Sequence, residues 1–133
     1  MEARDKCLEE GGYLVEIDSN EETAAITAAI ISQGWMSQRK EFWIGLSDLE
    51  TVGQWRWDHS RKLIGNGIYS NWDSGEPSLQ GTERCAHINT NYAWNNLPCD
   101  WKKIGQSSWH ALCESQGQCS VTAAWATPSP WSI

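Results

Sequence analysis

The sequence predicts an α+β domain in which two helices precede a group of short strands and one long ordered loop. Helix-forming patterns fill the start of the chain, and each pattern ends at glycine. Short apolar or alternating runs follow and are typical of strands. The chain of 133 residues is long enough for one hydrophobic core and too short for two. Helices and strands therefore share a single core, as in an α+β domain.

The first predicted helix covers residues 2–11 and stops at the Gly11-Gly12 pair, because glycine readily takes the left-handed conformation that ends a helix. Ala3 and Cys7 are four residues apart and share one face of this helix. Residues 13–17, with the sequence YLVEI, alternate in polarity and predict a short strand.

The second predicted helix begins within residues 18–22, where N-cap residue types are followed by two acids. We expect it to run through the sequence TAAITAAIISQ and to end at Gly34. Its apolar stripe consists of Ala25, Ile26, Ala29 and Ile30.

Five later segments are predicted to be strands. Four of them are the runs 42–48, 84–89, 93–99 and 109–115, and in the fifth, residues 53–59, Trp55 and Trp57 alternate outward from a turn. Within the first of them, Gly45 permits close approach of another backbone segment.

Tryptophan is unusually frequent, with 10 residues, and most of these side chains are expected to fill the core and its loops. The predicted core tryptophans are Trp43, Trp55, Trp57 and Trp94.

Two stretches lack a regular pattern. Residues 60–84 are rich in Gly, Asn, Ser and Asp, but Tyr69 and Trp72 favour an ordered loop, and long ordered loops are often functional. Residues 115–133 are rich in Ser, Thr and Pro, so we expect a disordered tail after a domain at residues 1–114.

Charge and composition exclude several classes of function. The formal net charge of -7 leaves no basic stripe for nucleic acid and disfavours anionic membranes. No apolar run approaches the length of a membrane span. No Ser/His/Asp grouping supports hydrolysis, so nothing in the residues alone points to an enzyme.

The five cysteines show neither a CxxC pair nor a zinc-type spacing. Widely spaced cysteines in a turn-rich chain favour disulfides and a secreted, extracellular location. The odd number leaves one cysteine over, which is either a free thiol or the link between two chains of a dimer.

Several segments together resemble the C-type lectin domain, in the order of that family and over roughly residues 2–114. They read EARDKCLEEGGYLVEIDSNEE, FWIGLSD, GQWRWD, YSNWDSGEPS, ERCAHI, WNNLPCD and ALCE. The resemblance implies a C-type lectin-like fold without its opening strand, which would leave the last strand as an open edge. It also implies disulfides between Cys7 and Cys113 and between Cys85 and Cys99, with Cys119 as the odd thiol.

The resemblance further implies one calcium site that also binds sugar. The matching residues are Glu76, Ser78, Glu83, Asn95 and Asn96. Calcium prefers six to eight oxygen ligands, and these side chains supply oxygens that two neighbouring sugar hydroxyls could complete. In the family the Glu-Pro bond is cis, which X-Pro bonds permit. The expected function is calcium-dependent glycan recognition, including microbial glycans in innate immunity.

Three positions set the expected strength and type of this site. Glu76 favours mannose-type over galactose-type sugars, whereas Ser78 stands where the mannose-type pattern has Asn. Asn96 stands where the family usually has Asp, which leaves two formal charges and predicts weak calcium binding. The alternative is a calcium-independent domain that binds a protein partner or an extracellular matrix or mineral surface.

Two further interpretations of the carboxylates are less favoured. Glu76 and Glu83 could form a glycosidase pair, but nothing else in the sequence supports that chemistry. The family's auxiliary calcium site is not predicted either: Asp48 matches one of its ligands, but Val52 and Leu79 stand where acids are expected.

Overall fold

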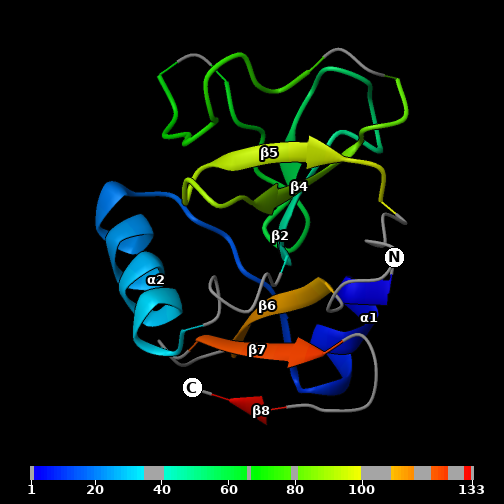
Figure 1. The fold of residues 1–133 in the computed structure, drawn as a ribbon. Coiled ribbons are helices and arrows are strands. Elements are labelled where there is room, and N and C mark those ends of the chain that lie inside the picture. The colour runs from blue at the N-terminus through cyan, green and yellow to red at the C-terminus, as the bar shows by residue number, and fades with distance from the viewer. Residues whose placement is uncertain are drawn as a thin grey trace.

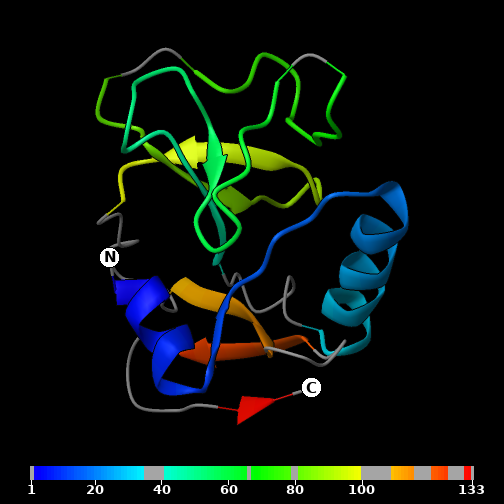
Figure 2. The same cartoon turned by 180° about the vertical axis from the view of Figure 1, so that it is seen from behind.

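The computed structural model describes residues 2–34, 41–65, 67–78, 81–99, 109–115, 121–125 and 131–132. It confirms the α+β class, with two helices beside one mixed sheet (Figures 1 and 2). The helices are α1 (Glu2–Glu9) and α2 (Asn20–Ser32). The strands are β1 (Gly12–Leu14), β2 (Glu41–Ser47), β3 (Arg56–Trp57), β4 (Cys85–Ile88), β5 (Trp94–Leu97), β6 (Trp109–Ser115), β7 (Val121–Trp125) and β8 (Trp131–Ser132).

Both helices begin and end where the sequence predicts. Ser19 is the N-cap of α2, and its hydroxyl accepts a hydrogen bond from the Glu22 N–H at 3.1 Å. The Glu22 carboxylate in turn accepts from the Asp18 N–H at 3.3 Å, so the start of α2 resembles a capping box. Gly11 and Gly34 follow the two helices with φ of 82° and 67°, a conformation that glycine adopts without strain.

The sheet has the order β5-β4-β2-β6-β7-β8, with β1 paired to β6 and β3 to β2. β2 runs parallel to β6 and antiparallel to β4. Gly45 lies in β2 so close to β1 that a Cβ atom there would come within 2.8 Å of the Leu14 carbonyl oxygen. The close approach predicted for this glycine is therefore confirmed.

Residues 121–125 and 131–132 differ from the sequence-based expectation of a disordered tail. Residues 121–125 form β7, which pairs antiparallel with β6 from Glu114↔Val121 to His110↔Trp125, and β8 pairs with β7. The expected open edge on β6 is therefore wrong, because β2 and β1 line one edge of that strand and β7 lines the other. An open strand edge has unpaired backbone groups, which a neighbouring strand can satisfy. The strand-forming run VTAAW was missed because the sequence around it is rich in Ser, Thr and Pro.

The core confirms the tryptophan assignment. Trp43 and Trp94 are fully buried, and Trp55 and Trp57 are nearly so. The larger buried cluster joins α2 to β2 through apolar side chains, among them Ile26 of α2. A smaller cluster lies around α1 and β6.

Both predicted disulfides are confirmed. Cys7–Cys113 joins α1 to β6, and Cys85–Cys99 joins β4 to the segment just after β5. Loss of a native disulfide from a small secreted domain typically costs about 2–5 kcal/mol. Cys119, the predicted interchain link, lies outside the described residues.

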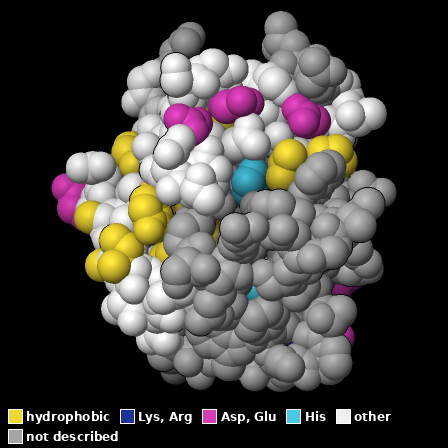
Figure 3. Space-filling view, viewed as in Figure 1, with side chains coloured by type: hydrophobic (Ala, Val, Ile, Leu, Met, Phe, Trp, Pro, Cys, Tyr) yellow, Lys and Arg dark blue, Asp and Glu magenta, His cyan; other side chains and the backbone are white. Residues whose placement is uncertain are grey.

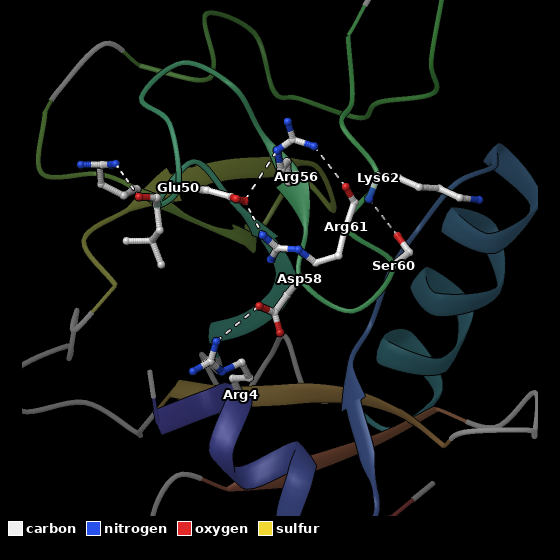
Figure 4. Close-up of polar contacts among 9 residues, drawn as sticks. Arg4, Glu50, Arg56, Asp58, Ser60, Arg61 and Lys62 are labelled. Carbon is white, nitrogen blue, oxygen red and sulfur yellow. Dashed lines mark hydrogen bonds and ion pairs between the residues drawn. The ribbon is translucent and has the colours of Figure 1, made fainter.

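Charged side chains connect α1 and the β2–β3 turn to the residues that follow β3 (Figure 4). Arg4 of α1 pairs with Asp58 at 3.5 Å, and Glu50 pairs with both Arg56 and Arg61. These pairs are substantially exposed, so each contributes little to stability. None of the helices in the described ranges is long and apolar enough to cross a membrane.

Candidate functional site

The candidate site lies in the long connection between β3 and β4, at the end of the molecule next to β5 (Figure 1). Acidic side chains gather along this end of the surface (Figure 3). The connection is held by aromatic packing: Trp72 contacts Trp55 and Trp94, with ring centroids 4.9 and 5.8 Å apart. Tyr69 packs on Trp94 and shares a hydrogen bond of 2.5 Å with the hydroxyl of Thr23 in α2. The prediction of an ordered loop is confirmed for its described residues.

Trp72 and Tyr92 pack against the larger core cluster. Both side chains are partly buried in this packing.

Asp73 lies in the long loop shortly before Glu76, and its side chain anchors this part of the loop. Its carboxylate accepts hydrogen bonds from the Asn89 and Asn91 side-chain amides at 2.7 and 3.0 Å, and from the Ser74 N–H at 2.8 Å. The bonds from Asn91, Asn89 and Ser74 lower the pKa of Asp73. The Asp73 N–H donates to the Trp94 carbonyl at 2.9 Å, so the loop is tied to β5 as well as to the β4–β5 turn.

Three of the five predicted site residues form one hydrogen-bonded group. Asn96, which is 1% exposed, accepts from the Ser78 N–H at 2.8 Å and donates to the Ser78 and Glu83 carbonyls at 3.0 and 2.8 Å. The Ser78 hydroxyl donates to the Glu83 carboxylate. This group joins the loop to β5.

Glu76 lies two residues before Ser78, across the cis Glu76-Pro77 bond predicted from the resemblance. Its Oε1 atom is buried and has no hydrogen-bond partner. A buried carboxylate oxygen without a partner is costly unless water, a cation or another donor satisfies it, so this oxygen is available to a ligand.

The side chains of Asn95 and Asn96 lie on opposite faces of β5. Side chains alternate along a strand, and Asn95 is half-buried where Asn96 is fully buried. The Asn95 amide nitrogen lies 3.0 Å from Nε2 of His87 on β4. The structure therefore brings Ser78, Glu83 and Asn96 together and places Asn95 against His87.

The oxygen atoms that the side chains of this loop offer fit a weak calcium site. The carboxylates of Glu76 and Glu83 and the hydroxyl of Ser78 offer the oxygens that calcium prefers, and Glu76 Oε1 lacks any other partner. Asn96 fits less well, because both ends of its amide already bind backbone groups. In the part of the chain that the structure describes, no three His, Cys, Asp or Glu side chains form a group able to hold a metal ion. A cation here would depend on neutral oxygens beside two carboxylates.

Asp48 has a structural role. It is buried and accepts from the Gly53 N–H at 2.9 Å and from Arg84 Nε at 3.2 Å. Arg84 also donates to the Asp48 and Leu49 carbonyls, which fixes the end of the loop just before β4. Sequence reasoning missed this role of Arg84, since nothing in its neighbourhood points to Asp48.

A second group of acids, here called the basal acids, lies where the β1–α2 connection and the first turn of α2 meet β6, and was not predicted. It consists of Glu16, Asp18, Glu22 and Glu114. The Glu16 N–H donates to the Glu114 carboxylate at 3.0 Å, which joins residues 98 positions apart. Burial, with the neighbouring acid Asp18, raises the pKa of Glu22 to about 7. Burial also raises the pKa of Glu114, helped by the charges of Glu16 and Asp18.

A cavity of about 270 Å³ lies beside the basal acids. Trp57, Ile64 and Ile68 form apolar walls, and Glu16 and Asp18 line its acidic side. None of the five predicted site residues lines this cavity. It is therefore separate from the Glu76 and Glu83 region.

Comparison with known proteins agrees with the motifs. The family model described as Lectin C-type domain matches residues 1–105. The perlucin-like protein of Mytilus galloprovincialis is 32% identical over 106 residues, a match that covers 78% of this chain and 65% of that protein. The chain covers less than half of several other curated relatives, so it matches only a part of those proteins.

Solved structures show the same fold. The mouse scavenger receptor C-type lectin carbohydrate-recognition domain is 30% identical, with a TM-score of 0.62, over 74% of this chain and 70% of that one. The cow CD23 carbohydrate-recognition domain, solved in the presence of a GlcNAc2Man3 oligosaccharide, is 32% identical with a TM-score of 0.54. That match covers 73% of this chain and 67% of the cow chain.

Proposed function

The chain belongs to the C-type lectin domain family, and from this membership we propose that it binds glycans through its long loop with the help of calcium. C-type lectin domains are recognition modules without catalytic activity, which agrees with the absence of a hydrolytic grouping in the sequence. The two carboxylates of the loop are therefore interpreted as ligands and not as a glycosidase pair.

One observation supports the site above all others. Glu76 Oε1 is buried without a hydrogen-bond partner, in the loop that also carries the paired Ser78 and Glu83 side chains. A cation or a sugar hydroxyl at this position would satisfy that oxygen. The Asp73 carboxylate in the same loop, by contrast, accepts hydrogen bonds from Asn89 and Asn91.

The proposed division of labour follows from the chemistry of each side chain. Glu76 and Glu83 supply negative charge and accept hydrogen bonds from sugar hydroxyls, and Ser78 and Asn95 add neutral oxygens. Calcium, when bound, would offer coordination positions to two neighbouring hydroxyls of one sugar. With two carboxylates the site should be weak, with a dissociation constant of about 10⁻⁴–10⁻³ M, as in other extracellular modules.

Glu76 favours mannose-type sugars, and a related domain, that of cow CD23, was solved in the presence of an oligosaccharide that contains mannose. Two disulfides join distant parts of the chain, which suits an oxidising, extracellular environment. We therefore place the proposed binding outside the cell and direct it to mannose-type glycans.

Retention on immobilised mannose, with calcium and with chelator, tests the proposal. The variant Glu83→Gln keeps the size of the side chain but removes one of two charges, and it should abolish calcium-dependent retention. Glu9→Gln is the matched control, because Glu9 is an exposed residue of α1 far from the loop in the chain. Retention of Glu83→Gln equal to that of the control would refute the calcium site at this loop.

A second candidate function is calcium-independent binding of a protein partner or of an extracellular matrix or mineral surface. The Asn96 amide favours it, because it satisfies backbone groups of the loop with no cation. Binding that persists in chelator and survives Glu83→Gln would support this function over the first.

A further inference from the structure

We propose that Asn96 holds the binding loop on β5 by hydrogen bonds alone, so that the loop keeps its shape when calcium is removed. This inference rests on the proposed function only where it names the use of the loop. The physical claim concerns the order of the loop, which can be measured without any sugar.

The amide of Asn96 is fully used by the loop. Its oxygen accepts from the Ser78 N–H at 2.8 Å, and its nitrogen donates to the Ser78 and Glu83 carbonyls at 3.0 and 2.8 Å. Both hydrogens of a side-chain amide are thus engaged. The backbone also fixes which way the amide points, because only its oxygen can face an N–H and only its nitrogen can face two carbonyls. At 1% exposure these bonds are protected from water.

Aspartate could not make the same contacts. An ionised carboxylate accepts hydrogen bonds but cannot donate, so an aspartate at position 96 would place an oxygen against the Ser78 and Glu83 carbonyls. A cation between these oxygens would remove the repulsion. The family's usual aspartate therefore suits a loop that is held by an ion, whereas the asparagine of this chain suits a loop held by its own backbone.

Other protein contacts fix the two ends of the same segment. Before Ser78, Asp73 binds the amides of Asn89 and Asn91. After Glu83, Arg84 binds Asp48 and the neighbouring carbonyls. Asn96 provides the tie between these two ends. Calcium would then contribute to sugar binding without ordering the loop, and chelator would remove the first effect and not the second.

Hydrogen exchange of the Ser78 amide, resolved by NMR on the intact chain, tests this inference directly. In the wild-type chain its exchange rate should agree within about threefold between chelator and about 10 mM calcium, since its acceptor is Asn96. In Asn96→Asp the rate in chelator should rise at least about tenfold, and calcium should slow it again. Asn20→Asp, at the exposed start of α2, controls for the added charge and should behave as wild type.

Two results would overturn the inference. One is a wild-type Ser78 amide that exchanges more than about tenfold faster in chelator than in calcium. The other is an Asn96→Asp variant whose Ser78 amide is as protected in chelator as that of wild type. If Asn96→Asp does not fold, the wild-type comparison alone still decides.

Mannose retention of the same samples separates this inference from the proposed function. A protected Ser78 amide in a chain that binds no sugar would refute the function and leave the inference standing. Sugar binding by a loop whose Ser78 amide is protected only in calcium would refute the inference and leave the proposed function standing.

Discussion

The loop acids, Glu76 and Glu83, and the basal acids at α2 show two ways in which this domain places carboxylates. In the loop, the Ser78 hydroxyl donates to the Glu83 carboxylate, and Glu76 Oε1 is buried without a hydrogen-bond partner. The four basal acids lie near one another. Burial, together with the charges of neighbouring acids, raises the pKa of Glu22 and of Glu114. The loop acids are the proposed ligand-binding groups, whereas the basal acids serve the fold as acceptors of backbone N–H groups.

Acidity alone does not identify a binding site. The basal acids are more numerous, yet they accept backbone hydrogen bonds from the β1–α2 connection and from the turn after β3, through His59 and Ser60. Glu76 presents a buried oxygen without such a partner. Substitutions should therefore affect stability at the basal acids and binding at the loop acids.

The largest expected effect on stability comes from Glu114→Ala. Its carboxylate accepts from the Glu16 N–H, and removal of the acceptor leaves a partly buried donor unsatisfied at a cost of about 1–3 kcal/mol. Denaturant unfolding at pH 7 measures this loss. Glu114→Gln keeps an acceptor and should lose much less, so equal losses in the two variants would show that the contact with Glu16 is not what matters.

Calcium should produce the next largest effect. For a site with a dissociation constant of about 1 mM, about 10 mM calcium adds roughly 1.4 kcal/mol and raises the melting temperature by several degrees. Tryptophan fluorescence in calcium and in chelator measures the shift. Glu83→Gln should abolish it and Glu114→Gln should preserve it. The opposite pattern would place the ion at the basal acids and erase the distinction between the two regions.

The pH dependence of stability should reveal Glu22. Its folded pKa of about 7 exceeds the ordinary value of 4.5, so the folded state holds the proton more tightly than the unfolded state. The stabilisation is therefore fully present below pH 4.5 and is lost as the pH rises through about 7. Glu114 shifts in the same direction and adds to this trend.

Glu22→Gln tests the sign. Because it keeps the acceptor for the Asp18 N–H but cannot ionise, it should melt about 2–4 °C above wild type at pH 8 and equal to it near pH 4.5. Thermal melts at the two pH values measure the difference, which solvent screening will reduce at this partly exposed site. A variant less stable than wild type at pH 8 would contradict the assigned cause of the shift.

These expectations show what the sequence could and could not predict. The helices, the central strands and the buried tryptophans followed from local patterns, and the disulfides and the loop residues followed from the family resemblance. The basal acids could not be predicted, since Glu16 and Glu114 meet only because β1 pairs with β6. The role of Asn96 also escaped prediction, because it depends on the direction of one amide relative to a distant loop. β7 was missed because its composition resembles that of a linker.

Asp73→Asn should have the smallest effect on stability of all these variants. It tests whether the side-chain amides, and not a carboxylate, hold the loop and so leave Glu76 and Glu83 free for a ligand. The Asp73 carboxylate accepts from Asn91, Asn89 and Ser74, and these bonds lower its pKa. Its contribution to stability is present above the ordinary value of 3.8 and is lost as the pH falls through the lower folded value. Asp73→Asn should thus lower the melting temperature slightly at pH 7 and not at all near pH 2, while the Ser78 amide stays protected by Asn96. If the Ser78 amide lost its protection in Asp73→Asn, the contacts of Asp73 and of Asn96 would act as one unit. The loop would then depend on a carboxylate for its order, as the start of α2 depends on Glu22.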